Sequence, residues 1–284
     1  MKSSINKPKI FAINLLNNHL PGLVGYISAY SLLQRHKKAR KDKSTIIEKE
    51  MAILPRILKK GDYAIDIGAN IGEYTLLLSK IVGATGKVFA FEPIPSTFNK
   101  LKSLVKIAKL PNVKLFNIAL SNKKQKTIMV IEKTPEKWWN FHAAHISSNK
   151  NHHASKNIRK FEVTVNTLDN IFNGCSTLQF IKCDSEGMEL FILKGGKKLL
   201  HLLKPHILLE VAEDSYKRYG YSQSTLFKFL KQLGYIPVRL EGNKIQHKMR
   251  ETSCSEITEL SRKGACNCFF IQKNKLKNLL AKTK

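Results

Sequence analysis

The sequence Asp-Ile-Gly-Ala-Asn-Ile-Gly at residues 66–72 follows a short apolar segment and opens a second one, residues 73–81, that has helical spacing. A strand that runs through a glycine-rich turn into a helix N-terminus is how α/β sheets hold nucleotide-like ligands. Gly68 and Gly72 can adopt positive φ, and Asn70 is one of the few other residues that tolerate the left-handed conformation. We therefore expect a ligand to lie against bare backbone at this turn.

The acid at the start of the turn distinguishes it from a dinucleotide-binding loop, whose Gly-x-Gly-x-x-Gly pattern has no leading acid. Asp66 would repel a pyrophosphate, but it suits a ligand with a positive amino group, such as S-adenosylmethionine. A second predicted strand, residues 87–91, ends at Glu92, where a carboxylate can accept hydrogen bonds from both ribose hydroxyls. The two acids together favour an adenosyl sulfonium ligand over NAD.

Several motifs in one order extend this pattern along the chain. They are DIGANIGEYTLLL (66–78), VFAFEPIP (88–95), VNTLDNIF (165–172), FIKCDSEGMELFILKG (180–195) and PHILLEV (205–211). In this order they resemble the FkbM family of S-adenosylmethionine-dependent methyltransferases, over residues 58–271. The resemblance implies S-adenosylmethionine as cofactor and O-methylation, usually of a sugar or polyketide hydroxyl.

The expected fold is α/β, a Rossmann-like class I methyltransferase domain. Apolar strand-like runs alternate with helical segments through residue 211, which favours a mostly parallel sheet with helices on both faces. Residues 235–240 and 267–272 add two strands, which in this class form a terminal hairpin with one antiparallel strand. We expect seven strands in all. A single helix is expected over residues 188–203.

The resemblance assigns cofactor binding to residues at three predicted strand ends. Glu73, in the first turn of the helix, could reach the methionine amino group, or it could only favour the helix dipole. Ala119 follows the predicted strand 113–118, where such folds enclose the adenine. The expected cofactor-binding residues are Asp66, Gly68, Asn70, Gly72, Glu73, Glu92 and Ala119.

Asp184 and Glu186 follow the third predicted strand and are the expected catalytic residues. Open α/β sheets bind ligands at the carboxyl ends of their strands, so these acids should face the acceptor. One could take the hydroxyl proton, or both could hold a divalent ion such as Mg²⁺. They could also cap the following helix, and the two roles can hold at once. Glu210 ends the next strand and projects toward the same rim.

Residues 132–160 form a polar loop rich in aromatic and histidine side chains, and long loops of this kind are either functional lids or mobile insertions. We expect contact with the acceptor here, because exposed aromatic faces stack on sugars. The flanks, residues 127–131 and 161–165, alternate as a supporting pair of strands. The side chains concerned are Trp138, Trp139, Phe141, His142, His145, His152 and His153.

Residues 1–44 differ from the domain expected over residues 45–284. Asn, His and Pro interrupt the apolar piece 10–33, which argues against a membrane span or a signal peptide. A basic run, 35–43, follows. We favour a helical extension packed on the sheet over an element that contacts a membrane or the acceptor. Thr45 and Glu48 have the spacing of a capping box.

The net charge of +28 raises nucleic acid as a partner, but only eight of the 49 basic residues are arginine. Nucleic-acid recognition depends on bidentate arginine, and no RNA-recognition motif is present. An acidic acceptor, or a lipid-linked sugar at an anionic membrane, fits the charge better. The alternatives are an RNA-directed methyltransferase and a non-catalytic cofactor-binding scaffold. The sequence leaves the oligomeric state open.

The five cysteines form an odd set in a chain without an evident secretory signal, which indicates reduced thiols and a cytoplasmic protein. A zinc site from Cys254, Cys266, Cys268 and His247 is imaginable. Its spacing matches no standard zinc pattern, and buried structural thiols are commoner. We therefore assign no metal ligand.

Overall fold

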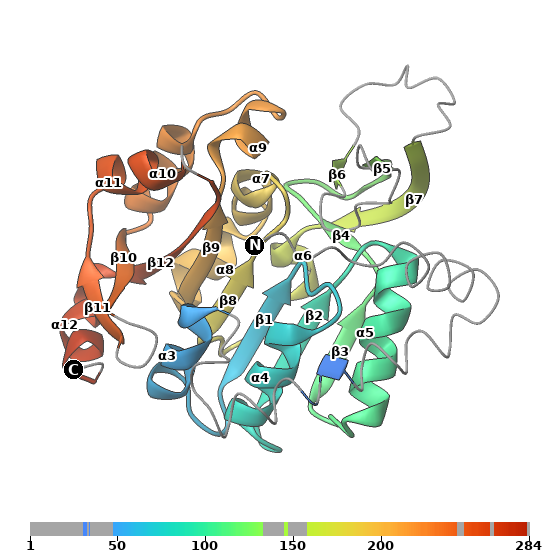
Figure 1. Cartoon of the computed structure of the whole chain (residues 1–284), viewed down its shortest axis with the longest axis horizontal. Helices are drawn as coiled ribbons and strands as arrows, with labels where there is room; N and C mark the ends of the chain where they lie inside the picture. The colour runs from blue at the N-terminus through green and yellow to red at the C-terminus, as the bar shows by residue number, and fades with distance from the viewer. Residues whose placement is uncertain are drawn as a thin grey trace, which may run out of the picture.

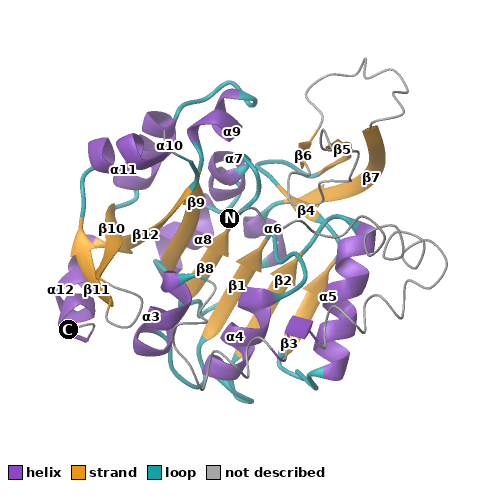
Figure 2. Cartoon of the chain, viewed as in Figure 1, coloured by secondary structure: helices purple, strands orange, loops and turns teal. Residues whose placement is uncertain are grey.

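The computed structural model describes residues 31, 32, 34, 48–132, 145–146, 158–242, 247–261 and 264–282. They form a large central sheet with helices packed against it, and a smaller sheet beyond the carboxyl ends of its strands (Figure 1). Helices flank the central strands on both sides (Figure 2). This is the α/β, Rossmann-like arrangement that the strand pattern predicts.

The central sheet has the strand order β11-β10-β12-β9-β8-β1-β2-β3. The five strands from β9 to β3 are parallel, and β12 pairs antiparallel with both β9 and β10. The strands are β1 (Tyr63–Ile67), β2 (Lys87–Phe91), β3 (Val113–Phe116), β8 (Phe180–Cys183), β9 (His206–Val211), β10 (Tyr235–Gly242), β11 (His247–Glu251) and β12 (Cys266–Gln272). The antiparallel terminal strand is therefore confirmed.

The sheet has eight strands where seven are predicted. The additional strand, β11, pairs antiparallel with β10 at the edge of the sheet. Its sequence, His-Lys-Met-Arg-Glu, is almost entirely polar and so lacks the apolar alternation by which a strand is recognised. An edge strand tolerates such residues because one of its sides faces no other strand.

Helices cover both faces, so the central strands are buried on both sides. Along β1, Ala64 faces the side covered by α3, α4 and α12, whereas Ile65 faces the side covered by α6, α7, α8 and α10. The helices are α3 (Lys49–Ile57), α4 (Glu73–Val82), α5 (Pro95–Ile107), α6 (Leu168–Ile171), α7 (Glu189–Lys194), α8 (Lys197–Leu203), α9 (Glu213–Lys217), α10 (Gln223–Gln232), α11 (Cys254–Ser261) and α12 (Lys273–Lys282).

The single helix predicted over residues 188–203 is wrong: α7 and α8 are separated by Gly195 and Gly196. A Cβ on Gly195 would lie 2.1 Å from the backbone oxygen of Ser121. The chain must pass close to that backbone, and only glycine allows it. Periodicity alone does not reveal such a contact, because the apolar pattern continues through both helices.

The smaller sheet has the order β4-β7-β5-β6 and carries the predicted acceptor-side loop. The strands expected on the loop's flanks are confirmed, with Thr127 opposite Val163 in an antiparallel pair. Its strands are β4 (Ala119–Leu120), β5 (Gln125–Glu132), β6 (His145–Ile146) and β7 (Ile158–Asn166). Trp138, Trp139, Phe141, His142, His152 and His153 lie outside the described residues, as does the side chain of His145.

Most of the predicted N-terminal extension also lies outside the described residues. Leu32 is buried in a cluster with Leu76, Leu104 and Leu110. In the part of the chain that the structure describes, no helix is both long and apolar enough to span a membrane.

The capping box predicted from Glu48 is wrong. Glu48 is itself the N-cap residue of α3, and its side chain makes no capping hydrogen bond. It instead accepts hydrogen bonds from the hydroxyl of Tyr74 and the amide of Asn267. Thr45 lies outside the described residues.

Candidate active site

The turn between β1 and α4 has the left-handed backbone that its sequence predicts. The φ angles are 71° at Gly68, 49° at Asn70 and 98° at Gly72, which is the N-cap residue of α4. A Cβ on Gly68 would lie 1.8 Å from the backbone oxygen of Asp184. The turns that follow β1 and β8 are therefore in direct contact, and glycine is required where they meet.

Asp66 lies beneath this turn and is fully buried. Its Oδ2 accepts a hydrogen bond of 2.6 Å from the hydroxyl of Thr75, and its Oδ1 has no hydrogen-bond partner among the described residues. Burial raises the pKa of this carboxyl, while Lys182 in the neighbouring strand opposes the shift. Asp66 thus links the end of β1 to α4 through Thr75.

Glu92 braces the same turn from the end of β2. Its Oε2 accepts a hydrogen bond of 3.0 Å from the backbone N–H of Asn70, and its Oε1 accepts one of 2.9 Å from Ile94. Burial raises the pKa of the Glu92 carboxyl to about 7, although both backbone donors favour the charged form. The carboxylate therefore holds the turn and also lines a cavity.

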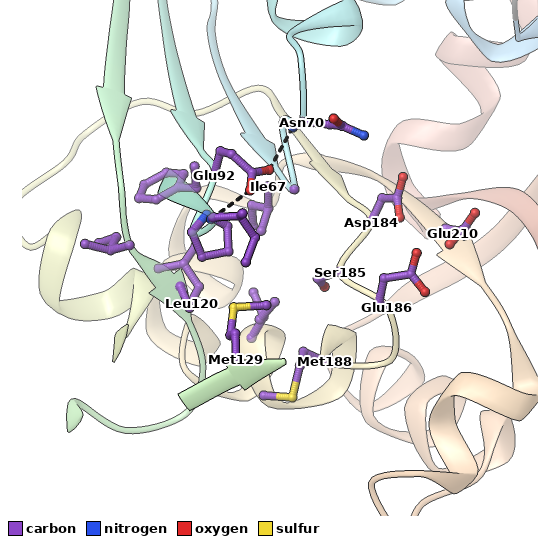
Figure 3. A pocket seen from close by; sticks show the side chains of 17 residues that line it. Ile67, Asn70, Glu92, Leu120, Met129, Asp184, Ser185, Glu186, Met188 and Glu210 are labelled. Carbon is purple, nitrogen blue, oxygen red and sulfur yellow. Dashed lines mark hydrogen bonds between the residues drawn. The ribbon is translucent and has the colours of Figure 1, made fainter. Parts of the chain in front are cut away.

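The cavity has a volume of about 220 Å³ and lies at the carboxyl ends of the parallel strands. In Figure 3, Glu92 lies on one side, Asp184, Glu186 and Glu210 lie on the other, and Met129 and Met188 close the base. The lining residues are Ile67, Gly68, Asn70, Phe91, Glu92, Pro93, Ile94, Ile118, Ala119, Leu120, Met129, Asp184, Ser185, Glu186, Met188, Ile192 and Glu210.

The structure thus brings four predicted cofactor-binding residues to one cavity: Gly68, Asn70, Glu92 and Ala119. The other three, Asp66, Gly72 and Glu73, do not line it. Gly72 packs against α5 instead, where a Cβ would lie 2.5 Å from the side chain of Leu104. The cavity joins an apolar wall to a carboxylate-rich rim.

The two predicted catalytic acids meet a third carboxylate on that rim. One oxygen of each of Asp184, Glu186 and Glu210 lies within 4.8 Å of the others, and all three residues are half-buried. Burial, with Asp184 as the next cause, raises the pKa of Glu186 to about 7 and that of Glu210 to about 8. The sequence signal that indicates Glu210 is its position near the end of β9, the strand that pairs with β8.

The interpretation of residues 184–187 as a helix cap is wrong. Helix α7 begins at Glu189, and its N-cap residue Met188 makes no side-chain capping bond. The segment is instead a turn with φ of 55° at Glu186 and 102° at Gly187. A left-handed glutamate is uncommon, and such backbone strain is concentrated at functional sites.

Two buried charged residues near this turn were not singled out from the sequence. Lys182 donates a hydrogen bond of 3.0 Å to Oδ2 of Asp184. Glu189 accepts hydrogen bonds from the backbone N–H and the hydroxyl of Ser185, at 2.8 and 3.0 Å. Both side chains occupy positions whose apolar surroundings predict core residues, so neither pattern marks them as part of a site.

The rim carboxylates could hold a metal ion, because hard divalent cations prefer oxygen ligands. In the described ranges, Asp184, Glu186 and Glu210 are the group of metal-binding side chains that approach one another closely enough. Cys254, Cys266 and Cys268 are free thiols and belong to no such group among the described side chains, which do not include that of His247.

Comparison with known proteins shows the family to which the chain belongs. A model of the methyltransferase FkbM domain matches residues 66–237, which include both turns and the whole carboxylate rim. Among curated proteins, a ribosomal RNA large subunit methyltransferase E from Buchnera aphidicola subsp. Cinara cedri (strain Cc) is 36% identical over 67 residues. The match covers 24% of this chain and only 32% of that protein.

Among solved structures, the methyltransferase FkbM from Methylobacillus flagellatus KT has a TM-score of 0.46 at 14% identity, with 88% of this chain and 59% of that chain covered. A SAM-dependent methyltransferase from Aquifex aeolicus has a TM-score of 0.41 at 18% identity, with 79% and 87% covered. Because the family model matches more than half of the chain, the protein belongs to the FkbM family of S-adenosylmethionine-dependent methyltransferases.

Proposed function

We propose that the protein transfers the methyl group of S-adenosylmethionine to a hydroxyl of a sugar, glycan or glycolipid. The observation that carries this proposal is the convergence of Asp184, Glu186 and Glu210 on the cavity rim. In a chain of net charge +28, acids are scarce, yet three of them meet here. A carboxylate rim accepts hydrogen bonds from neighbouring hydroxyls and repels a polyanion.

The cofactor would occupy the cavity with its adenine against the apolar wall of Phe91, Ile118 and Ala119. Glu92 would accept hydrogen bonds from the ribose hydroxyls, and Gly68 lets the ligand approach the backbone of the turn. The methyl group would then point toward the carboxylate rim, which the cavity joins to the adenosyl end.

The reaction is an in-line displacement, in which the acceptor oxygen attacks the methyl carbon and the carbon–sulfur bond breaks. Alignment of the two reactants supplies much of the rate. One rim carboxylate, Asp184 or Glu210, would take the hydroxyl proton as the new bond forms. If a divalent cation is bound, the rim carboxylates would hold it, and it would polarise the acceptor oxygen.

An RNA acceptor is the second candidate, supported by the short match to a ribosomal RNA methyltransferase and by the high net charge. Phosphate binding would need cations near the methyl group, whereas the rim is acidic. We therefore rank RNA below a neutral polyhydroxyl acceptor. A lipid-linked sugar at an anionic membrane would reconcile the acidic rim with the basic chain.

The test begins with calorimetric titration of the purified protein with S-adenosylmethionine, with NAD as the control. Methyl transfer from tritium-labelled S-adenosylmethionine is then measured on sugar glycosides, extracted glycolipids and total RNA, with Mg²⁺ or with EDTA. We expect label in a carbohydrate fraction. Label in RNA alone would contradict the proposal and favour an RNA-directed methyltransferase. Binding of S-adenosylmethionine without transfer to any fraction would favour a non-catalytic, cofactor-binding scaffold.

A further inference from the structure

Lys182 is a buried cation in the middle of the central sheet. It lies on β8 directly beside Asp66 of β1, its partner in the parallel register. Only 7% of the residue is exposed. An ammonium group in such a place is costly unless carboxylates compensate it, so its position needs an explanation beyond packing.

Lys182 connects the turn between β1 and α4, here called the cofactor turn, to the carboxylate rim. Its Nζ lies 3.0 Å from Oδ2 of Asp184 and 3.5 Å from the backbone oxygen of Gly68. The ring of Tyr74 covers the same ammonium, with its centroid 5.1 Å away. An ammonium has three donors, and here two of them are directed at the two turns that form the site.

The ion pair is asymmetric in its burial. The side chain of Lys182 is 9% exposed, whereas that of Asp184 is 35% exposed and lines the cavity. Burial lowers the pKa of Lys182, but the carboxylates of Asp184 and Asp66 outweigh it and hold that pKa above its ordinary value. A fixed cation thus lies behind a carboxylate that faces the cavity.

The crowding of the rim gives this arrangement a function. Glu186 and Glu210 lie close to Asp184, and after burial the charge of Asp184 helps to raise the pKa of both. Lys182 supplies a buried cation that compensates the charge of Asp184 among these carboxyl groups. With Lys182 in place, a hydrogen bond holds Oδ2 of Asp184, and the Asp184 carboxylate keeps one orientation.

We propose that Lys182 is a positioning residue, which ties Asp184 to the cofactor turn so that its carboxylate is aimed at the transferred methyl group before any acceptor binds. The inference rests on the proposed function, since it takes Asp184 to face the methyl group. Lys182 itself does not touch the substrate.

The probe for this arrangement is sinefungin, an analogue that carries an amino group where S-adenosylmethionine carries its methyl. S-adenosylhomocysteine has no group at that place. The ratio of the two dissociation constants therefore reports whether an oriented carboxylate faces the methyl position, without any acceptor. Calorimetry on the full chain measures both constants, and thermal unfolding checks that each variant folds.

We expect sinefungin to bind the native protein more tightly than S-adenosylhomocysteine, and Asp184→Asn to reduce that preference about tenfold or more. Lys182→Met should reduce it by a similar factor while S-adenosylhomocysteine still binds. The double variant should lose no more than either single one, because both remove the same oriented carboxylate. Lys100→Met is the control, since it removes another partly buried ammonium, on α5.

Each of the following results would overturn the inference. An unchanged preference in Lys182→Met means that the lysine only supports the fold, and an increased one means that it only neutralises Asp184. A preference that is unaffected by Asp184→Asn removes Asp184 from the methyl position, and this result contradicts the proposed function as well. Loss in Asp184→Asn without loss in Lys182→Met contradicts the positioning role alone.

Discussion

Gly68 touches Asp184: a Cβ on the glycine would lie 1.8 Å from the backbone oxygen of the aspartate. The contact joins the turn after β1 to the turn after β8, two segments more than a hundred residues apart in sequence. The two sides of the cavity to which these turns contribute are thus fixed relative to each other by backbone. A change at the glycine should therefore disturb both sides.

Gly68→Ala should destabilise the protein by about 3 kcal/mol or more, because a left-handed alanine costs about 1–2 kcal/mol and the clash must also be relieved. Cofactor binding should be lost with it. Urea unfolding and calorimetry measure the two effects.

Gly174→Ala is the matched control. Gly174 also has positive φ, at 76°, but a Cβ at this position would meet no atom of the described residues within 4 Å. Gly174→Ala should therefore be destabilised only by the cost of a left-handed alanine. Equal destabilisation by the two substitutions would contradict a role for the contact with Asp184.

Glu92 gives cofactor binding a pH dependence of defined sign. Burial raises the pKa of its carboxyl to about 7, and ribose hydroxyls donate to the charged form. The affinity for S-adenosylhomocysteine should therefore rise as the pH rises through 7, by up to about tenfold per pH unit below it. Calorimetry between pH 5.5 and 8.5 measures this.

Glu92→Gln should bind more weakly at high pH and should lose that rise, because the amide does not titrate. Asp214→Asn, on the exposed side chain of α9, should bind as the native protein does. A rise that persists in Glu92→Gln would assign the dependence to another group.

The left-handed positions of the cofactor turn were predictable from sequence because few residue types tolerate that backbone. Gly68, Asn70 and Gly72 all adopt it. The strand-end acids were predictable for a similar reason, since parallel strands present their carboxyl ends at one edge. Glu92, Asp184 and Glu210 all line the cavity there.

Lys182 and Glu189 could not be predicted, because their meaning depends on partners in three dimensions. The sequence around Lys182 is that of a buried strand, and only the register with β1 places Asp66 beside it. Glu189 continues a helical pattern, and its contact with Ser185 depends on where the helix begins. Local periodicity contains neither relationship.

Asp184→Asn and Glu210→Gln test the acceptor side. Each should lower methyl transfer about a hundredfold or more while the affinity for S-adenosylmethionine changes little, because proton transfer and acceptor alignment are lost but the adenosyl contacts remain. Labelled transfer and calorimetry on the same samples separate the two effects. An unfolded Asp184→Asn would instead indicate a structural role, and Glu210→Gln then still tests the rim.

Glu189 should make stability depend on pH. Burial raises the pKa of its carboxyl to about 7, above the ordinary value of 4.5. Between these values the folded protein keeps a proton that the unfolded chain loses, so this contribution to stability is lost as the pH rises through 7. Glu189→Gln has no charge to desolvate, and its oxygen can still accept the hydrogen bonds from Ser185. The variant should gain stability relative to the native protein between pH 5 and pH 8.

Glu189→Ala, which leaves the N–H of Ser185 without its partner, should lose about 1–3 kcal/mol of stability at both pH values. Urea unfolding at pH 5 and pH 8 measures the free energy of unfolding of all three proteins. A stability difference between Glu189→Gln and the native protein that is the same at both pH values would contradict a raised pKa of Glu189 in the folded protein.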